Sequence, residues 1–279
     1  MAADEYVQIN RASWDEKAPA HAASPGYAVQ RFVDDPGFLS DVVTFDRPRL
    51  GDIEGQRGVH LQCHIGTDTI SLARLGARMT GLDLSPASLE QARSLAQRTG
   101  VAVDFVESEV YEALDVLGHE RFDLVYTGIG ALCWLPSVER WAEVVAGLLA
   151  PGGRLFLREG HPMLWAMEDA RADHLLAVEH PYFERPEPSV WDEPGTYVET
   201  DVEFVHTVTF EWNHGLGEIV TALLGHGLQL LALEEHDSVP WNALPGEMAP
   251  VSELPGEWRL IDRPWRLPHT YTLQARKPS

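Results

Sequence analysis

The sequence of 279 residues is poor in cysteine, in basic residues and in long hydrophobic runs. Its two cysteines, Cys63 and Cys133, are too few for a disulfide framework and suit a reducing compartment. Only 21 Lys and Arg stand against 43 Asp and Glu, and the net charge of −22 leaves no basic stripe to bind phosphates. The composition therefore argues against a nucleic-acid partner, and solubility is the simplest account of the acidity.

No run of roughly 18 consecutive apolar residues occurs, and the first six residues carry two acids instead of an apolar signal core. We therefore expect a cytoplasmic protein without a membrane partner. No metal-ligand spacing occurs either. His60 and His64 lie at i and i+4, but on a strand and turn they would not share a face as they would on a helix, so we expect no metal.

The most informative stretch begins at Val59 and ends at Ser85. It reads as a short apolar strand, a turn with one glycine (Gly66), a helix that opens at 67–69, and a second strand that ends on Asp83. This is the front half of a nucleotide-binding βαβ unit, in which a carboxylate about 20 residues beyond the turn accepts hydrogen bonds from ribose hydroxyls. Asp83 is the candidate for that role.

The turn itself argues against a dinucleotide. A dinucleotide fingerprint needs glycines that let the backbone approach a pyrophosphate at the helix N-terminus, but Gln62 and His64 stand in two of those positions. Asp68 adds a negative charge in the first turn of the helix, which would repel a phosphate. A ligand with ribose but no phosphate fits better, and Gly66 still permits close approach of the backbone.

This stretch resembles the first motif of class I S-adenosylmethionine (SAM)-dependent methyltransferases, in which Val-Leu-Asp-Leu-Gly-Cys-Gly-x-Gly is usual. Residues 59–66 read Val-His-Leu-Gln-Cys-His-Ile-Gly, a variant that we identify with a bacterial small-molecule branch carrying Leu-Gln-Cys-His. His60 stands where the family often has an acid, and two glycines are replaced. The resemblance covers about residues 55–160, and it implies SAM as the cofactor and S-adenosylhomocysteine (SAH) as its product.

Strand and helix signals then alternate along the chain, as expected of a parallel sheet. Further helices are expected at 86–99, 137–149 and 217–227, and further strands at 101–106, 122–126, 154–158, 228–235 and 270–276. With the resemblance, this pattern predicts an α/β fold with a doubly wound, mostly parallel seven-stranded sheet. Its last strand is antiparallel, and a β-rich insertion follows the fifth strand.

The chain divides into four segments on this reading. By resemblance, residues 1–50 form an N-terminal helical lid over the cofactor, and 51–160 form the SAM-binding Rossmann-like core. Residues 161–215 form an insertion with antiparallel strands, because mostly apolar residues recur at every second position over 202–212 and predict a strand there. Its place after the fifth strand would let it wall the acceptor pocket. Residues 216–279 are expected to complete the core sheet.

The resemblance also assigns cofactor contacts. An acid after the third strand binds the adenine amino group in the family, and Glu109 with the Val110 amide falls on that position, with Glu107 as a rival. The other candidates belong to the lid, the first turn, the end of the second strand and the segment after the fourth: Tyr6, Trp14, Gln62, His64, Gly66, Asp83, Leu84, Tyr126, Thr127 and Gly128. For Trp14 and His64, ordinary packing and turn roles remain equal alternatives.

Methyl transfer needs a dry site that aligns the two reactants, and a general base only if the acceptor must lose a proton. His161, His206 and Tyr126 are the candidate catalytic groups, although a structural role is the simpler interpretation of any one among twelve histidines. Aromatic residues of the insertion and of the last loops are candidates for substrate binding: Trp165, Trp191, Tyr197, Trp212 and Trp241. If they line the pocket, they favour a planar or cationic amphiphilic acceptor.

The sequence thus predicts an enzyme, with a place in secondary metabolism, that transfers a methyl group from SAM to a small-molecule acceptor by in-line substitution. The acceptor is an aromatic or amine-bearing natural product, methylated at nitrogen, oxygen or carbon. A non-catalytic SAM-binding module is the first alternative because the first motif is altered. A nicotinamide-dependent oxidoreductase is the second, and the missing glycines disfavour it. A homodimer is also compatible with the sequence.

Overall fold

The computed structural model describes residues 5–279, and its centre is a seven-stranded sheet. The strands of this sheet are β1 (Arg57–Leu61), β2 (Arg78–Asp83), β3 (Asp104–Glu107), β4 (Phe122–Thr127), β5 (Leu149–Gly160), β8 (Gln229–His236) and β11 (Thr270–Arg276). Their order is β3-β2-β1-β4-β5-β11-β8, and β1 to β5 pair in parallel. Strand β11 runs antiparallel to both neighbours, which confirms the predicted fold class.

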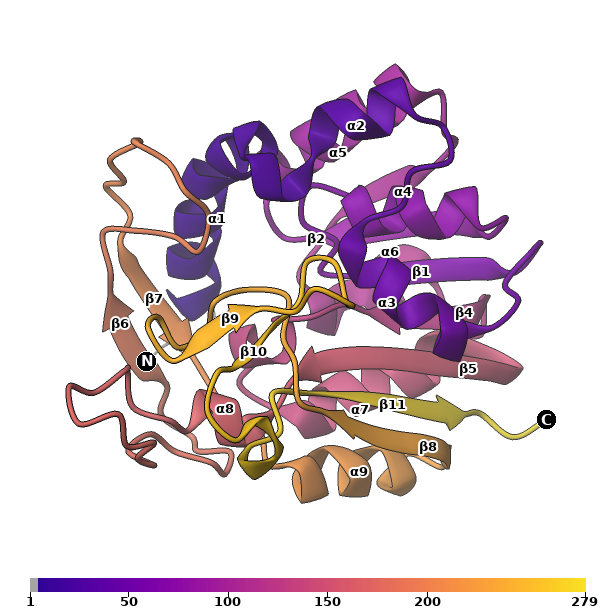
Figure 1. Ribbon diagram of the computed structural model, residues 1–279. Coiled ribbons are helices and arrows are strands. Elements are labelled where there is room, and N and C mark those ends of the chain that lie inside the picture. Colours follow the sequence, from indigo (N-terminus) through magenta and orange to yellow (C-terminus); the bar gives the residue numbers. More distant parts are fainter. Residues whose placement is uncertain (1–4) are drawn as a thin grey trace.

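Helices cover both faces of the sheet (Figure 1). They are α3 (Asp41–Leu50), α4 (Thr67–Arg74) and α5 (Pro86–Thr99), and α6 (Ala113–Leu117), α7 (Val138–Leu148) and α9 (Leu216–Gly225). Successive side chains of a strand point to opposite faces. Along β4, Val125 accordingly packs in the cluster that contains α7 and α9, and Tyr126 in the cluster that contains α3 and α4.

Local signals explain where these helices begin and end. In α5 the Ser85 hydroxyl accepts a hydrogen bond from the Ser88 N–H, Pro86 occupies the first turn, and Gly100 ends the helix with φ +67°. A hydroxyl at the N-cap, proline at N1 and a left-handed glycine at the C-terminus are the preferred residues at these positions. These signals made the helix over 86–99 predictable, and the structure confirms it.

The N-terminal segment is helical over its described part. It contains α1 (Glu5–Ala23), the short 3-10 helix η1 (Pro25–Tyr27), α2 (Val29–Asp34) and α3. Residues 1–4 of the predicted lid lie outside the described residues. Helix α1 packs on α5 and on β7 (Val208–Glu211), so this segment connects the core to the insertion (Figure 1).

The insertion after β5 contains α8 (Pro162–Trp165) and a two-stranded antiparallel sheet of β6 (Ser189–Asp192) and β7. The strand predicted over 202–212 is wrong in its first half, since β7 begins only at Val208. The N–H groups of Val205 and His206 instead bind the Glu16 carboxylate of α1, and the Val205 side chain is 81% exposed. Apolar alternation therefore predicted more strand than forms.

The segment that connects β8 to β11 in the sequence forms a second two-stranded sheet. It consists of β9 (Met248–Pro250) and β10 (Trp258–Leu260), and its apolar residues share a core cluster with Leu164 of α8. The sequence predicted only the end of the core sheet in 216–279, because these strands have three residues each and show no clear period. The remaining short 3-10 helices are η2 (Val110–Glu112), η3 (Leu132–Trp134) and η4 (Pro264–Arg266).

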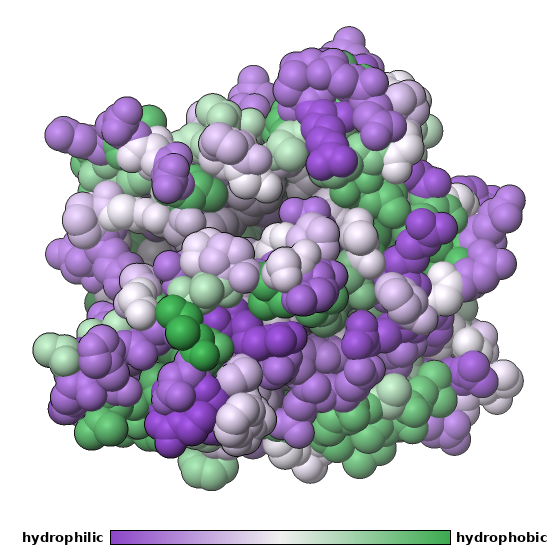
Figure 2. Space-filling view, in the orientation of Figure 1, coloured by the Kyte–Doolittle hydropathy of each residue, from purple (hydrophilic) through white to green (hydrophobic). Residues whose placement is uncertain are grey.

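Among residues 5–279, no helix has the length and apolar character needed to cross a membrane. Figure 2 shows that hydrophilic side chains cover much of this face, interrupted by smaller apolar areas. One apolar area coincides with edge strand β8, where Leu231 is 49% exposed.

Candidate functional site

A pocket lies at the carboxyl ends of the first strands, beneath α1. Its lining comes from α1, from the residues that follow β1, β2 and β3, and from the segment around η3: Tyr6, Val7, Asn10, Trp14, Gln62, Leu84, Ser108, Glu109, Val110, Trp134 and Leu135. Parallel α/β sheets bind ligands at the carboxyl ends of strands, next to the point where the strand order reverses, which here is between β1 and β4. Predicted cofactor residues Tyr6, Trp14, Gln62, Leu84, Glu109 and Val110 meet in this pocket.

The turn between β1 and α4 has an unusual backbone. Gln62 (φ +57°), His64 (φ +48°) and Gly66 (φ +79°) are all left-handed, and each such non-glycine residue costs on the order of 1–3 kcal/mol. The turn is held by its surroundings: the Gln62 side-chain amide donates to the Ala131 carbonyl at 2.8 Å. A Cβ at Gly66 would lie 2.8 Å from the Ala92 Cβ, so packing against α5 requires a glycine at this position.

Asp83, at the end of β2, fixes the same turn. Its Oδ2 accepts a hydrogen bond from the His64 N–H at 2.7 Å, and its Oδ1 accepts one from the Ser85 N–H at 2.9 Å. Burial raises the pKa of Asp83 to about 6. Each carboxylate oxygen has a second lone pair that can accept a ribose hydroxyl. Asp83 thus holds the turn, and its ribose role stays a prediction.

Glu109 lies in the pocket, whereas its rival Glu107 does not. The Glu109 carboxylate accepts hydrogen bonds from the Tyr111 N–H at 2.9 Å and from the Tyr6 hydroxyl at 3.4 Å, and burial raises its pKa. Glu107 instead forms a surface ion pair with Arg11. Glu109 and Val110 therefore line the pocket side by side, and the adenine role stays a prediction.

Helix α1 closes the pocket and ties it to the insertion. The Asn10 amide pairs with the main chain of Phe210 in β7, donating to its carbonyl and accepting from its N–H, both at 2.9 Å. Tyr6 contacts the Trp212 ring edge to face at 5.2 Å between centroids. The pocket wall formed by α1 therefore depends on the insertion for its position.

Six aromatic rings from separate segments form a second cluster beside the pocket, which we call the aromatic enclosure. Its members come from α1, η1, the β1–α4 turn, η3 and the insertion: Trp14, His21, Tyr27, His64, Trp134 and Tyr197. Trp14 and Trp134 belong to both the enclosure and the pocket lining. The predicted substrate residue Tyr197 and the predicted cofactor residue His64 thus lie in one cluster.

Glu159 anchors the loop that follows β4, and sequence reasoning missed it. Its carboxylate, 3% exposed, accepts hydrogen bonds from the N–H groups of Gly130 (2.5 Å), Ala131 (2.8 Å) and Leu132 (2.9 Å). The buried imidazole of His214 meets the carbonyls of Leu132 and Leu135 in the same loop. An acid next to the last residue of a largely buried strand was the available signal, because a buried carboxylate needs several donors.

None of the three predicted catalytic side chains lines this pocket. Tyr126 points to the α3 face, where its hydroxyl donates to Asp46 at 2.6 Å and its ring stacks on Phe156. His161 caps α8 with one ring nitrogen and binds Glu235 with the other, so neither nitrogen is available. His206 is an exposed residue of the insertion that binds Glu16.

Five other predicted cofactor residues also stand outside the pocket lining: His64, Gly66, Asp83, Thr127 and Gly128. His64 and Asp83 belong to the turn beside it, Gly66 packs on α5, Thr127 is fully buried in β4, and Gly128 lies against His60. The five predicted substrate residues do not gather in one place either. Trp165 stacks on Trp241 at 5.5 Å, and Trp191 contacts His180. The remaining two, Tyr197 and Trp212, contact residues of α1.

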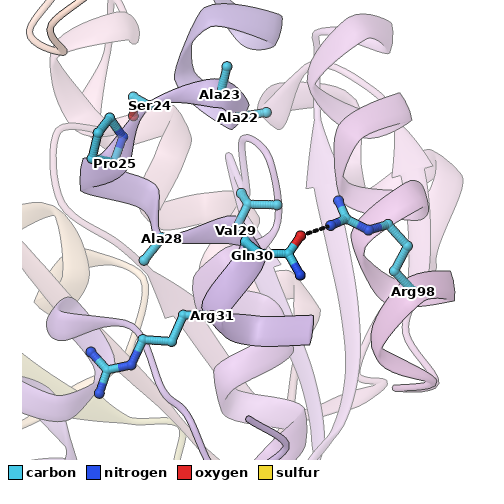
Figure 3. A pocket seen from close by; sticks show the side chains of 9 residues that line it. All are labelled: Ala22, Ala23, Ser24, Pro25, Ala28, Val29, Gln30, Arg31 and Arg98. Atoms are coloured by element: carbon cyan, nitrogen blue, oxygen red, sulfur yellow. Dashed lines mark hydrogen bonds between the residues drawn. The ribbon is translucent and has the colours of Figure 1, made fainter. Parts of the chain in front are cut away.

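Another depression lies between the end of α1, α2 and α5 (Figure 3). Among the residues drawn there, one hydrogen bond joins them, from the Arg98 guanidinium to the Gln30 side-chain oxygen at 2.9 Å. None of the predicted site residues lines this depression. In residues 5–279 no group of three or more His, Cys, Asp or Glu side chains has the geometry to hold a metal ion.

Residues 59–155 match the family model described as a methyltransferase domain. This match confirms the predicted resemblance for that part of the chain, and the Leu-Gln-Cys-His variant stays a prediction. The matched residues include the pocket residues Gln62 and Glu109, and Asp83, which holds the turn beside the pocket.

Relatives and solved structures agree with this match. Methyltransferase phqN of Penicillium fellutanum is 37% identical over 115 residues, covering 40% of this chain and 34% of that protein. A ubiquinone biosynthesis O-methyltransferase of Azorhizobium caulinodans is 34% identical over 119 residues, covering 40% and 43%. This chain thus spans less than half the length of these two curated relatives.

A crystal structure of an S-adenosylmethionine-dependent methyltransferase from Mesorhizobium loti has the same fold, with a TM-score of 0.60 and 22% sequence identity. The similarity covers 85% of this chain and 98% of that one. The fold is therefore shared well beyond the matched domain.

Proposed function

We propose that this chain, whose residues 59–155 form a methyltransferase domain, is a SAM-dependent methyltransferase that acts on a small molecule. The observation that carries the proposal is the pocket beneath α1. Glu109 and the Val110 backbone line it and would recognise the adenine, and Asp83 stands at the end of β2 next to the pocket residue Leu84. A ribose acid and an adenine acid at the ends of successive strands suit a nucleoside without a pyrophosphate.

The lining has unused hydrogen-bonding capacity that fits such a ligand. Among the described residues, the Gln62 Oε1 is buried without a hydrogen-bond partner, although the same side chain donates to Ala131. A buried amide oxygen without a donor is costly, and a hydroxyl or ammonium of the ligand would satisfy it. Gln62, Asp83 and Glu109 are the residues that would hold SAM.

When bound, SAM supplies an electrophilic methyl group on a positively charged sulfur. The contribution of the protein is to orient the two reactants and exclude water, and well-oriented pairs gain roughly 7–11 kcal/mol of entropic advantage. Helix α1 covers the pocket and is fixed to β7 through Asn10. The same helix therefore excludes solvent from the cofactor and positions the insertion.

A small-molecule acceptor, aromatic or amine-bearing, is the finer part of the proposal. The name of the Azorhizobium caulinodans relative supports it, since that protein is an O-methyltransferase of ubiquinone biosynthesis. The aromatic enclosure next to the pocket offers flat apolar faces for such a molecule. Methylation at nitrogen, oxygen or carbon is compatible with these faces.

Ligand binding followed by a transfer assay tests the proposal. Isothermal titration with SAH should give one binding site per chain, and NAD should not bind. Incubation with SAM carrying a deuterated methyl group and a panel of phenols, heteroaromatics and amines should then yield labelled products by mass spectrometry. SAH binding without transfer would favour a non-catalytic module. The two non-glycine residues of the altered turn, Gln62 and His64, are the observation that supports this alternative. Absence of SAH binding would contradict both.

A further inference from the structure

Glu159 is a buried acid that does not line the cofactor pocket but holds a loop beside it. It stands next to the end of β5, and its carboxylate accepts hydrogen bonds from the three consecutive N–H groups of 130–132 and from the Gly160 N–H at 2.6 Å. Hydrogen bonds to an ionised acceptor are roughly twice as strong as those between neutral groups. The carboxylate therefore fixes the backbone of this loop.

Two peptide units of the loop connect Glu159 to the pocket. A trans peptide unit is planar, and its N–H and C=O point in opposite directions. The 130–131 unit donates its N–H to Glu159 Oε2, and its carbonyl accepts a hydrogen bond from the Trp134 indole at 2.7 Å. The 131–132 unit donates to the same oxygen, and its carbonyl accepts from the Gln62 amide at 2.8 Å. Since Trp134 and Gln62 both line the pocket, one acid fixes the partners of two lining side chains.

The contact with the loop also decides which atom of the Gln62 amide is left for a ligand. A carbonyl oxygen only accepts hydrogen bonds, so the amide nitrogen must be the atom that faces the Ala131 carbonyl. The remaining atom, Oε1, is buried and has no hydrogen-bond partner among the residues that the structure describes. A buried acceptor without a donor is costly, so this oxygen calls for a donor from the ligand.

The strand order indicates which donor reaches Gln62. In the proposed function Glu109, after β3, recognises adenine, and Asp83, at the end of β2, binds ribose. Gln62 follows directly on β1, which is the next strand of the sheet, and neighbouring strands lie about 4.8 Å apart. A ligand that crosses β3 and β2 in this order reaches β1 with the part beyond its ribose. In SAM and SAH the only hydrogen-bond donor of that part is the α-ammonium, because the carboxylate and the sulfur cannot donate.

We propose that Glu159 is a positioning residue for the cofactor, and that the Gln62 amide, which it holds through the loop, accepts a hydrogen bond from the α-ammonium at Oε1. The inference rests on the proposed function above and extends it from the nucleoside to the amino-acid tail. This contact needs a side chain, which a glycine at position 62 would not supply. The altered turn therefore has a binding role of its own.

The same loop also orients an aromatic part of the pocket wall. The Trp134 indole, which donates to the Gly130 carbonyl, contacts Trp14 of α1 edge to face at 5.1 Å between ring centroids. Both rings line the pocket. The loop thus positions the polar contact to the tail and the aromatic wall beneath α1 together, and a change at Glu159 should disturb both.

This arrangement predicts selectivity for the charged tail. Deamino-SAH, in which hydrogen replaces the α-ammonium, keeps the nucleoside, the thioether and the carboxylate, so a comparison with SAH isolates the single contact to Gln62. Hydrogen bonds to charged groups are the stronger ones in proteins, and wild type should therefore prefer SAH over deamino-SAH by about tenfold or more.

Calorimetric titration of SAH and deamino-SAH into wild type and three variants tests the inference. Gln62→Met removes the amide and keeps an unbranched side chain at this left-handed position, and it should bind the two ligands with nearly equal affinity. Glu159→Gln has one acceptor oxygen in place of two, and its preference for SAH should be lower than that of wild type. Asp46→Asn is the control, since Asp46 is also fully buried but its partner Tyr126 does not line the pocket, and it should keep the wild-type preference.

The ratio of the two affinities separates the possible outcomes, because a loss of folded protein lowers both affinities equally and leaves their ratio unchanged. The full wild-type ratio in Gln62→Met would overturn the contact to the ammonium. The full ratio in Glu159→Gln, or an equal loss in Asp46→Asn, would overturn the positioning role of Glu159. Equal binding of both ligands by wild type would overturn the inference and leave the proposed function intact, whereas a wild type that binds neither would contradict the proposed function itself.

Discussion

The Asp83 carboxylate accepts a hydrogen bond from the main-chain N–H of His64 at 2.7 Å, so the acid at the end of β2 fixes the turn that follows β1. Asp83→Ala should therefore weaken SAH binding by about 1–3 kcal/mol, the cost of losing a buried charged hydrogen bond. Calorimetry measures this change. Glu107→Ala is the matched control, because Glu107 pairs with Arg11 on the surface, and its affinity should equal that of wild type. Equal affinity in Asp83→Ala would refute the ribose role.

Glu159→Gln should loosen the loop after β4. A neutral amide has one acceptor oxygen in place of two, which leaves at least one of the Gly130, Ala131 and Leu132 N–H groups without its partner. An unsatisfied buried donor costs about 1–3 kcal/mol. Hydrogen exchange should show faster exchange of these three amides, together with a lower free energy of unfolding. Unchanged exchange at 130–132 would mean that the carboxylate is not their anchor.

Asn10→Ala should detach α1 from β7. The substitution removes both hydrogen bonds to Phe210 and leaves the main-chain groups of Phe210 without their partner. We expect faster dissociation of SAH and affinity reduced by about 1–3 kcal/mol, because α1 forms one wall of the pocket. Gln8→Ala, at an exposed position of the same helix, is the control. Loss of affinity in both variants would mean that the effect is not specific to the Asn10 contact.

Asp46 predicts a pH dependence of stability. Burial raises its pKa to about 7, against an unfolded value near 3.8, although the nearby Arg158 and the Tyr126 hydroxyl lower it. The native state therefore binds more protons than the unfolded state between about pH 4 and pH 7. The contribution of Asp46 to stability is fully present below this window and is lost as pH rises through about 7.

The comparison with Asp46→Asn isolates this contribution. The free energy of unfolding of wild type minus that of Asp46→Asn should fall between pH 5 and pH 8, measured by urea denaturation. Asp123→Asn should give a difference that is flat over this range. The pKa of Asp123 is lowered by its hydrogen bond to Arg57, so it titrates below the range. A difference for Asp46→Asn that rises with pH would contradict the raised pKa.

The candidate catalytic residues show where sequence reasoning stopped. The strand that contains Tyr126 was predicted from its pattern. The direction and partner of the Tyr126 side chain were not, because its hydroxyl binds Asp46 of α3, 80 residues away in the sequence. The strand position before His161 was also predicted. Its ring caps α8 and reaches Glu235, so a residue placed at a strand end by pattern proved to be a structural one.

The sequence by itself determined the strands of the central sheet, the helix caps and the altered turn, because apolar period, proline, glycine and N-cap hydroxyls act over a few residues. It therefore predicted Asp83 at the end of β2 and the closing strand over 270–276. Only the tertiary structure decided that Asn10 binds β7, that Glu159 anchors the loop after β4, and that His21 meets His64. These contacts join residues 28 to 200 positions apart, and they form because packing satisfies buried polar groups that no local pattern can pair.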